Sequence, residues 1–244
     1  MKTTWKQTLY IHWENTDISG KLSLSGLGQL LINTATQHAE NLGFGYKELK
    51  NQNLNWVLFR MNIEIIRRPK WNEKITLTTW PAGISGLAGL REFVMHDEKQ
   101  NILCKANSEW LIIDLSSRKP KRLNQFEDIL KFEQQEKVFT ATPPIANRKG
   151  NFNDLFSVVI RHSDMDLNKH ATARRYFNWM EDALYQIHGE KEIELIQITF
   201  FNETYLNETV VLQIDDKKTT VRGIKSNDGK PAFMAAVKFN GTMI

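Results

Sequence analysis

The order of predicted elements repeats along the chain, and this repeat constrains the fold more than any other feature. In the first half, residues 6–24 alternate like a strand and turn at Asp17 and Gly20, and a helical pattern covers Ser25 to about Lys50. One face of that helix carries Leu27, Leu30, Leu31, Thr34, Ala35, His38 and Leu42, and Gly43 and Gly45 mark its expected end. Strand-like segments then follow at Trp56–Arg67, Lys74–Trp80, Leu87–His96 and Ile102–Asp114.

The second half has the same order of elements. A strand over about Asn153–His162 leads through a turn from Asp164 to Lys169 into a helix from about Ala171 to His188. Strands are predicted near Glu194–Phe201, Thr209–Asp215, Lys218–Lys225 and Ala232–Phe239. The two halves share matching pieces in the same sequence: Asp17 with Asp166, Trp71-Asn72-Glu73 with Leu206-Asn207-Glu208, and Ala106 with Ala235. We interpret this as a structural duplication.

One long helix followed by antiparallel strands predicts a sheet wrapped around a helix, and two such units in tandem can pair their sheets edge to edge. We therefore predict an α+β chain with an N-terminal domain over 1–130, a linker over 131–151 and a C-terminal domain over 152–244. The linker is polar, contains Pro143-Pro144 and shows no sustained strand pattern.

The composition is that of a globular protein with room for a substantial core. Of 244 residues, 41% are hydrophobic and 25% charged. No apolar run approaches the ~20 residues that span a bilayer, and the first residues lack the apolar stretch of a signal peptide. A single cysteine, Cys104, excludes an internal disulfide and fits a reducing compartment, so we expect a cytoplasmic protein with no membrane contact.

The positive charge is modest in total but clustered. The formal net charge is +4. The basic groups are Arg67, Arg68 and Lys70; Arg118, Lys119, Lys121 and Arg122; and Arg174 and Arg175. Such groups attract an anionic partner, which leaves nucleic acid, an acidic protein and a phosphate-bearing cofactor open beside a merely solvated surface. Nucleic acid is disfavoured because the clusters lack interleaved aromatics, and no metal spacing or phosphate-binding loop is present.

The most informative segment for chemistry comes just before the second helix. Asp166, Asn168 and His170 stand at alternate positions, which predicts that their side chains share one side of an extended segment. A carboxylate, an amide and an imidazole then converge where a helix begins and its free N–H groups point outward. Asp and Asn alone are ordinary turn residues, but the histidine in the same register favours a reaction site for a polarised carbonyl.

Asp166-Leu-Asn168-Lys-His170, continuing through Tyr176 and Trp179, resembles the signature of the plant and bacterial acyl-ACP thioesterases. Further similar landmarks occur in the expected order: Trp56-Val-Leu-Phe-Arg60, Arg68-Pro69-Lys-Trp71, Thr79-Trp80-Pro81-Ala-Gly83 and Arg91-Glu-Phe93. The resemblance covers roughly residues 8–215. It implies two tandem hot-dog domains and hydrolysis of acyl-[acyl-carrier-protein] without a cofactor, in fatty acid biosynthesis.

The resemblance also implies the catalytic residues. The family uses Asp166, Asn168 and His170 of this motif together with a glutamate some thirty residues on, which matches Glu203. Plant members place a cysteine after that glutamate, and this chain has Thr204, so a cysteine nucleophile at that site is excluded. Cys104 stands in an apolar register and is expected to be a buried core thiol.

These residues suit thioester hydrolysis. We expect N–H groups near Ala171 and Thr172 to stabilise the oxyanion and the Asn168 amide to add a donor or position a water. His170 is an acid–base group or donor, and Glu203 acts with it as the base that activates water. Asp166 either orients the network or attacks directly to form an anhydride, and both mechanisms stay open.

The remaining predictions concern the substrate. We expect the acyl chain to contact Trp56, Leu58, Trp80 and Phe93 of the first domain, and the acidic carrier protein to meet Arg174 and Arg175. Three alternatives remain: an acyl-CoA thioesterase, a dehydratase, which the motif disfavours, and a non-catalytic acyl-binding protein. The paired sheets allow a self-sufficient monomer, and association into a homodimer is left open.

Overall fold

The computed structural model describes residues 4–123, 137–143, 146 and 149–241. These residues divide into two compact units, one of Met1–Ser23 and Leu30–Ala141 and the other of Leu24–Gln29 and Thr142–Ile244. Residues 131–136, 144–145 and 147–148 of the predicted linker lie outside the described residues. No helix in the described part of the chain is both long enough and apolar enough to cross a bilayer.

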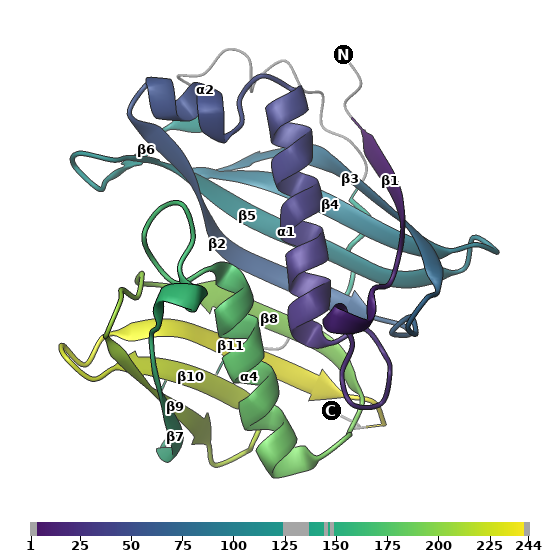
Figure 1. Cartoon of the computed structure of the whole chain (residues 1–244), viewed down its shortest axis with the longest axis vertical. Coiled ribbons are helices and arrows are strands. Elements are labelled where there is room, and N and C mark those ends of the chain that lie inside the picture. The colour runs from purple at the N-terminus through teal and green to yellow at the C-terminus, as the bar shows by residue number, and fades with distance from the viewer. Residues whose placement is uncertain (1–3, 124–136, 144–145, 147–148, 242–244) are drawn as a thin grey trace. The chain divides into compact units, whose positions relative to one another are not determined.

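The first unit is an antiparallel sheet with helix α1 lying across it (Figure 1). Its strands are adjacent in the order β1-β3-β4-β5-β2, with β6 paired to β5. The elements of this half are β1 (Trp5–Tyr10), a 3₁₀ turn (Trp13–Asn15), α1 (Leu24–Asn41), α2 (Tyr46–Asn51), β2 (Leu54–Ile65), β3 (Lys74–Ser85), β4 (Ala88–Asp97), β5 (Ile102–Asp114) and β6 (Pro120–Lys121).

The second unit repeats this arrangement around helix α4. Its strand order is β7-β9-β10-β11-β8, so each strand occupies the place of its counterpart in the first unit. The elements are β7 (Phe152–Val159), a 3₁₀ turn (His162–Asp164), α4 (Ala173–His188), β8 (Ile193–Phe200), β9 (Thr209–Asp215), β10 (Thr220–Lys225) and β11 (Pro231–Phe239). The predicted duplication is therefore confirmed by topology.

Apolar side chains explain the packing of helix on sheet in each unit. In the second unit, α4 buries Phe177 and Met180, and the ring of Tyr176 meets that of Phe233 edge-on at 5.6 Å between centroids. In the first unit, the predicted apolar face of α1 is buried at Leu31 and Ala35. Full burial of side chains of this size supplies the main stabilisation of both units.

Two predicted segments near the start of the chain differ from the structure in part. The helical pattern over Ser25 to about Lys50 forms two helices. α1 ends at Asn41, just before Gly43 with its left-handed φ of 80°, in agreement with the predicted end at Gly43 and Gly45, and the carboxylate of Glu40 accepts the N–H of Tyr46 at 2.7 Å, which starts α2. The strand expected over residues 6–24 ends at Tyr10, where the chain turns into its 3₁₀ segment.

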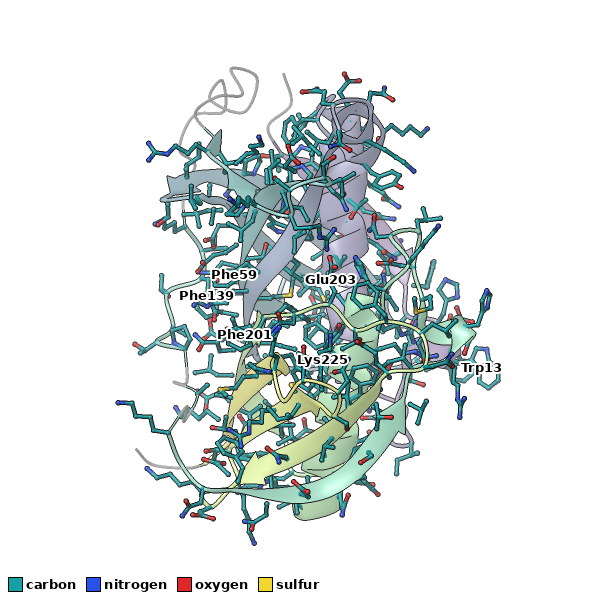
Figure 2. The ribbon with its side chains drawn as sticks, turned by 90° about the vertical axis from the view of Figure 1, so that its left-hand side faces the viewer. Trp13, Phe59, Phe139, Phe201, Glu203 and Lys225 are labelled. Atoms are coloured by element: carbon teal, nitrogen blue, oxygen red, sulfur yellow. The ribbon has the colours of Figure 1, made fainter. Side chains whose placement is uncertain are left out.

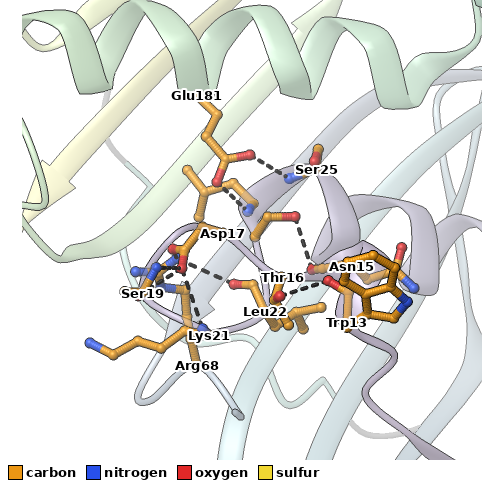
Figure 3. Close-up of polar contacts among 12 residues, drawn as sticks. Trp13, Asn15, Thr16, Asp17, Ser19, Lys21, Leu22, Ser25, Arg68 and Glu181 are labelled. Carbon is orange, nitrogen blue, oxygen red and sulfur yellow. Dashed lines mark hydrogen bonds and ion pairs between the residues drawn. The ribbon is translucent and has the colours of Figure 1, made fainter. Parts of the chain in front are cut away.

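Within the second unit, Glu181 of α4 caps the first turn of α1. Its two carboxylate oxygens accept the N–H groups of Leu24 at 2.8 Å and Ser25 at 3.2 Å (Figure 3). The first N–H groups of a helix have no partner inside the helix, and a carboxylate there also complements the helix dipole.

Candidate active site

The segment that precedes α4 is a tight turn rather than an extended strand. The Asp166 N–H donates to the carbonyl of His170 at 2.9 Å, and Lys169 has a left-handed φ of 63°. Oδ1 of Asp166 accepts the N–H of Asn168 at 2.8 Å, which is the hydrogen bond of an Asx turn. The turn brings the side chains of Asp166 and His170 together, and Asn168 is exposed at its tip, so the expectation that the three residues lie on an extended segment is wrong.

His170 lies between two carboxylates. Its Nδ1 is 3.5 Å from Oδ2 of Asp166, and its Nε2 is 3.4 Å from Oε1 of Glu203. The three side chains are between 19% and 30% exposed, so solvent reaches them without fully screening their charges. A protonated imidazole donates from both ring nitrogens, and each nitrogen here has an acceptor to face.

A backbone hydrogen bond brings Glu203 to the turn. The segment after β8 passes beside it, and the carbonyl of Thr204 accepts the N–H of Ala171 at 2.8 Å. Glu203 immediately precedes this contact, and its carboxylate is therefore held near His170 although 33 positions separate the two residues in the sequence. The predicted grouping of Asp166, His170 and Glu203 is what the structure contains.

The two N–H groups that were expected to bind an oxyanion already donate hydrogen bonds within the protein. The N–H of Ala171 donates to Thr204 as above, and the N–H of Thr172 donates to the carbonyl of Asp164 at 2.9 Å. The prediction that these two groups stabilise an oxyanion is therefore wrong. The reason is that the helix begins only at Ala173, and the residues before it close the turn against neighbouring segments.

Thr204 is a buried structural residue. Its Oγ1 lies 3.0 Å from the hydroxyl of Tyr176, and its side chain has no solvent exposure. Burial raises the pKa of Tyr176 to about 12, and the negative charges of Glu203 and Asp166 add to that rise. The phenol consequently stays protonated and neutral beneath the site.

Of the two predicted basic residues on α4, one has a structural partner. Nε of Arg175 lies 2.8 Å from Oδ1 of Asp164, which links the first turn of the helix to the 3₁₀ segment. Arg174 is partly exposed on the same turn. Cys104, by contrast, is buried on β5, where burial raises the pKa of its thiol, in agreement with the predicted core thiol.

The residues expected to contact an acyl chain lie in the first unit, in or beside its core. Leu58 and Trp80 are 8% exposed and Phe93 is fully buried. Trp56 is partly buried and packs against two hydrophobic clusters, one that contains Leu49 and one that contains Leu42. Its indole N–H donates to a backbone carbonyl at 2.9 Å. These contacts are equally those of ordinary core residues.

A polar pair buried in the first unit was not predicted. Nδ1 of His38, on α1, lies 2.9 Å from the guanidinium of Arg91, which also contacts Thr79 at 3.3 Å. Burial lowers the pKa of Arg91 to about 10. The helical spacing had placed His38 on the apolar face of its helix, but the guanidinium partner comes from a distant strand and has no local signal.

Sequence reasoning also missed two residues beside Glu203. The hydroxyl of Tyr205 donates to Oε2 of Glu203 at 2.6 Å, and Nζ of Lys225 donates to the carbonyl of Glu203 at 3.2 Å. Figure 2 labels Glu203 and Lys225 on neighbouring segments. The sequence shows a tyrosine two residues after the glutamate, but it does not show that the tyrosine side chain turns back toward the carboxylate.

Comparison with known proteins gives a consistent family assignment. The family model of the acyl-ACP thioesterase N-terminal domain matches residues 2–131, and that of the acyl-ACP thioesterase C-terminal domain matches residues 147–240. The chain is similar to the crystal structure of an acyl-ACP thioesterase from Bacteroides thetaiotaomicron, with a TM-score of 0.85, 26% identity and 98% of each chain covered. The predicted α+β hot-dog fold is thereby confirmed.

Two curated plant proteins are similar to this chain over only part of their own length. Oleoyl-acyl carrier protein thioesterase 2 of Arabidopsis thaliana is 20% identical over 85% of this chain and 61% of its own length. Palmitoyl-acyl carrier protein thioesterase of Gossypium hirsutum is 26% identical over 74% of this chain and 47% of its own length. The match thus spans about half to three fifths of these relatives, both of which are chloroplastic.

Proposed function

Because the chain belongs to the acyl-ACP thioesterase family, we propose that it hydrolyses acyl-[acyl-carrier-protein] to a free fatty acid and the carrier protein. This reaction ends chain elongation in fatty acid biosynthesis. The observation that carries the proposal is the position of His170 between the carboxylates of Asp166 and Glu203, since an imidazole flanked by carboxylates is suited to moving a proton near neutral pH.

The geometry supports the following division of roles. Glu203 and His170 together take a proton from water, the resulting hydroxide attacks the thioester carbonyl, and the carbon–sulfur bond breaks as the proton passes to the departing thiolate. Asp166 orients His170, because one of its oxygens is held by the turn at 2.8 Å while the other faces Nδ1. With the Ala171 and Thr172 N–H groups already used, we assign oxyanion stabilisation to the Asn168 amide.

The substrate contacts complete the proposal. Trp56, Leu58, Trp80 and Phe93 are assigned to the acyl chain, for which each buried CH₂ contributes roughly 0.8 kcal/mol. The carrier protein is acidic, and the partly exposed Arg174 is the better candidate for its contact because Arg175 is paired with Asp164. Steering by such charges is screened by salt.

Thiol release from a chain-length series of acyl carriers, with matched acyl-CoA esters, tests the proposal. We expect faster turnover on carrier-bound chains, a rise in apparent KM at high salt, and a loss of about 10³-fold in kcat for His170→Ala. His162→Ala is the matched control, because His162 is an exposed histidine of the preceding 3₁₀ segment.

The outcomes separate the rival functions. Faster turnover on acyl-CoA identifies an acyl-CoA thioesterase, and bound acyl chains without turnover identify a binding protein. Asp166→Ala, Asn168→Ala and Glu203→Ala are each expected to lose most activity, whereas Cys104→Ala and Thr204→Ala keep it. Full activity in His170→Ala contradicts the assigned site.

A further inference from the structure

The two carboxylate oxygens of Glu203 have different neighbours. Oε1 faces Nε2 of His170 at 3.4 Å, while Oε2 accepts a hydrogen bond from the hydroxyl of Tyr205 at 2.6 Å. A distance of that length is typical of a hydroxyl donating to an ionised carboxylate. One oxygen is therefore turned toward the imidazole and the other is held by a phenol.

The backbone of Tyr205 is itself held in place. Its N–H donates to Oε2 of Glu208 at 2.8 Å, and Oε1 of Glu208 pairs with Nζ of Lys225 at 3.1 Å. The same ammonium lies 5.6 Å from the centre of the Tyr205 ring and donates to the carbonyl of Glu203. The Lys225 side chain is only 8% exposed, so this network fixes the segment that carries both Glu203 and Tyr205.

We propose that Tyr205 is a positioning residue, whose hydroxyl holds Oε2 of Glu203 so that the carboxylate stays ionised with Oε1 directed at His170. The inference rests on the proposed function. A glutamate carboxylate on its own rotates broadly about its last torsion, and a donor to one oxygen removes that freedom. A donor to the ionised form also makes a carboxylate harder to protonate.

The charges around Glu203 explain why such a donor is needed. Asp166 lies across His170 from it, and two carboxylates near one imidazole disfavour each other's ionised form. The positive charge of Lys225 is shared with Glu208. On α4, Tyr176 faces the site as a neutral phenol, because its pKa is raised to about 12, and burial is the largest cause of that rise. The hydroxyl of Tyr205 is thus a direct stabiliser of the Glu203 carboxylate.

Replacement of the hydroxyl alone tests the inference. We expect Tyr205→Phe to lower kcat about tenfold with KM nearly unchanged and to move the acidic limb of the kcat profile upward by about one pH unit. The direction follows because a carboxylate without its donor takes up a proton at higher pH and then no longer acts as a base. Tyr185→Phe is the matched control, since Tyr185 is a half-exposed tyrosine on α4.

A second measurement does not depend on turnover. The ¹³C carboxyl resonance of labelled Glu203, identified by its loss in Glu203→Gln, is expected to titrate about one pH unit higher in Tyr205→Phe than in the wild-type chain. If Tyr205→Phe changes neither the titration of the Glu203 carboxyl nor the pH profile of kcat, the proposed role of Tyr205 is wrong. If the wild-type chain does not hydrolyse the substrate, the proposed function is wrong. The titration then still tests whether the Tyr205 hydroxyl stabilises the ionised Glu203 carboxylate.

Discussion

The same turn occurs once in each unit, with different side chains on it. Asp17 accepts the N–H of Ser19 at 2.8 Å, just as Asp166 accepts that of Asn168 at 2.8 Å. In both turns the aspartate N–H donates to the carbonyl four residues on, at 2.8 Å and 2.9 Å. Both turns also follow a 3₁₀ segment and precede a helix. The backbone of the site is therefore not what distinguishes the two halves.

The two turns differ at three positions of the proposed site, and one of these is Ser19 in the place of Asn168. Leu22 donates its N–H to the carbonyl of Pro69 at 2.7 Å, as Ala171 does to Thr204, so Arg68 occupies the position of Glu203. By the same register, Lys21 stands where the second turn has His170. The first turn consequently carries an ion pair, and the second carries an imidazole between two carboxylates.

The ion pair gives the first turn a structural role. The guanidinium of Arg68 lies 2.5 Å from Oδ2 of Asp17, and both residues belong to the group of polar contacts drawn in Figure 3. Although burial alone raises the pKa of Asp17, the hydrogen bonds from Ser19 and Arg68 and the charge of Arg68 lower it below its ordinary value. A carboxylate that is paired with a guanidinium stabilises the turn but exchanges no proton near neutral pH. The same backbone turn therefore carries a structural ion pair in the first unit and the proposed site in the second.

The largest effect is expected from giving the second turn the residue of the first. His170→Lys replaces the imidazole between Asp166 and Glu203 with an ammonium, which has no nitrogen lone pair to accept a proton, so kcat should fall by about 10³-fold. The reciprocal Lys21→His is the control and should leave kcat unchanged. Thiol release by both variants checks this, and a His170→Lys variant with near wild-type kcat contradicts the difference between the turns.

The next largest effect is expected when the first turn receives the residue of the second. Arg68→Glu places two carboxylates together without their cation, and the Arg68 side chain is only 12% exposed. We expect the free energy of unfolding to fall by about 2 kcal/mol, less than for a fully buried pair. Urea unfolding measures this, and Lys6→Glu, at an exposed cation on β1 of the same unit, is the control. An unchanged midpoint shows that the pair is not structural.

Regular elements were predictable because their signal is local. The bounds of β5 and β9 agree with the alternation of Ile102–Asp114 and Thr209–Asp215, and α4 ends at His188, as predicted, just before Gly189. The break between α1 and α2 also has a local signal in Gly43. Its exact place, however, depends on the Glu40 carboxylate, which only the folded chain positions.

The site was predictable in its residue types but less so in its contacts. The motif and the family resemblance identified Asp166, His170 and Glu203, which do lie together. The use of the Ala171 N–H was not predictable, because its partner is the Thr204 carbonyl, 33 residues away in the sequence. Hydrogen bonds between distant segments decide which donors remain for a substrate, and no local pattern reports them.

Acid titration distinguishes the two aspartates with a smaller effect. A lowered folded-state pKa means that the Asp17 carboxylate adds stability above its unfolded pKa of about 3.9, and this stability is lost as pH falls through the folded value. Asp17→Asn should therefore cost up to about 1 kcal/mol at neutral pH and show a weaker loss of stability in acid. Asp166→Asn should instead lose activity, and equal acid profiles for wild type and Asp17→Asn contradict this.

The smallest effect is expected at the tips of the two turns. Ile18 is 81% exposed and Leu167 is 83% exposed, so replacing either by serine should change the free energy of unfolding by less than about 0.5 kcal/mol. In the proposed function a carrier-bound substrate reaches the turn that carries Asp166 and Asn168, and Leu167 stands between them, so Leu167→Ser should raise KM for acyl carrier about threefold. Ile18→Ser should leave KM unchanged, because its turn carries an ion pair instead of the proposed site. Equal KM values for both variants would mean that the tip of the second turn is as remote from the substrate as the tip of the first.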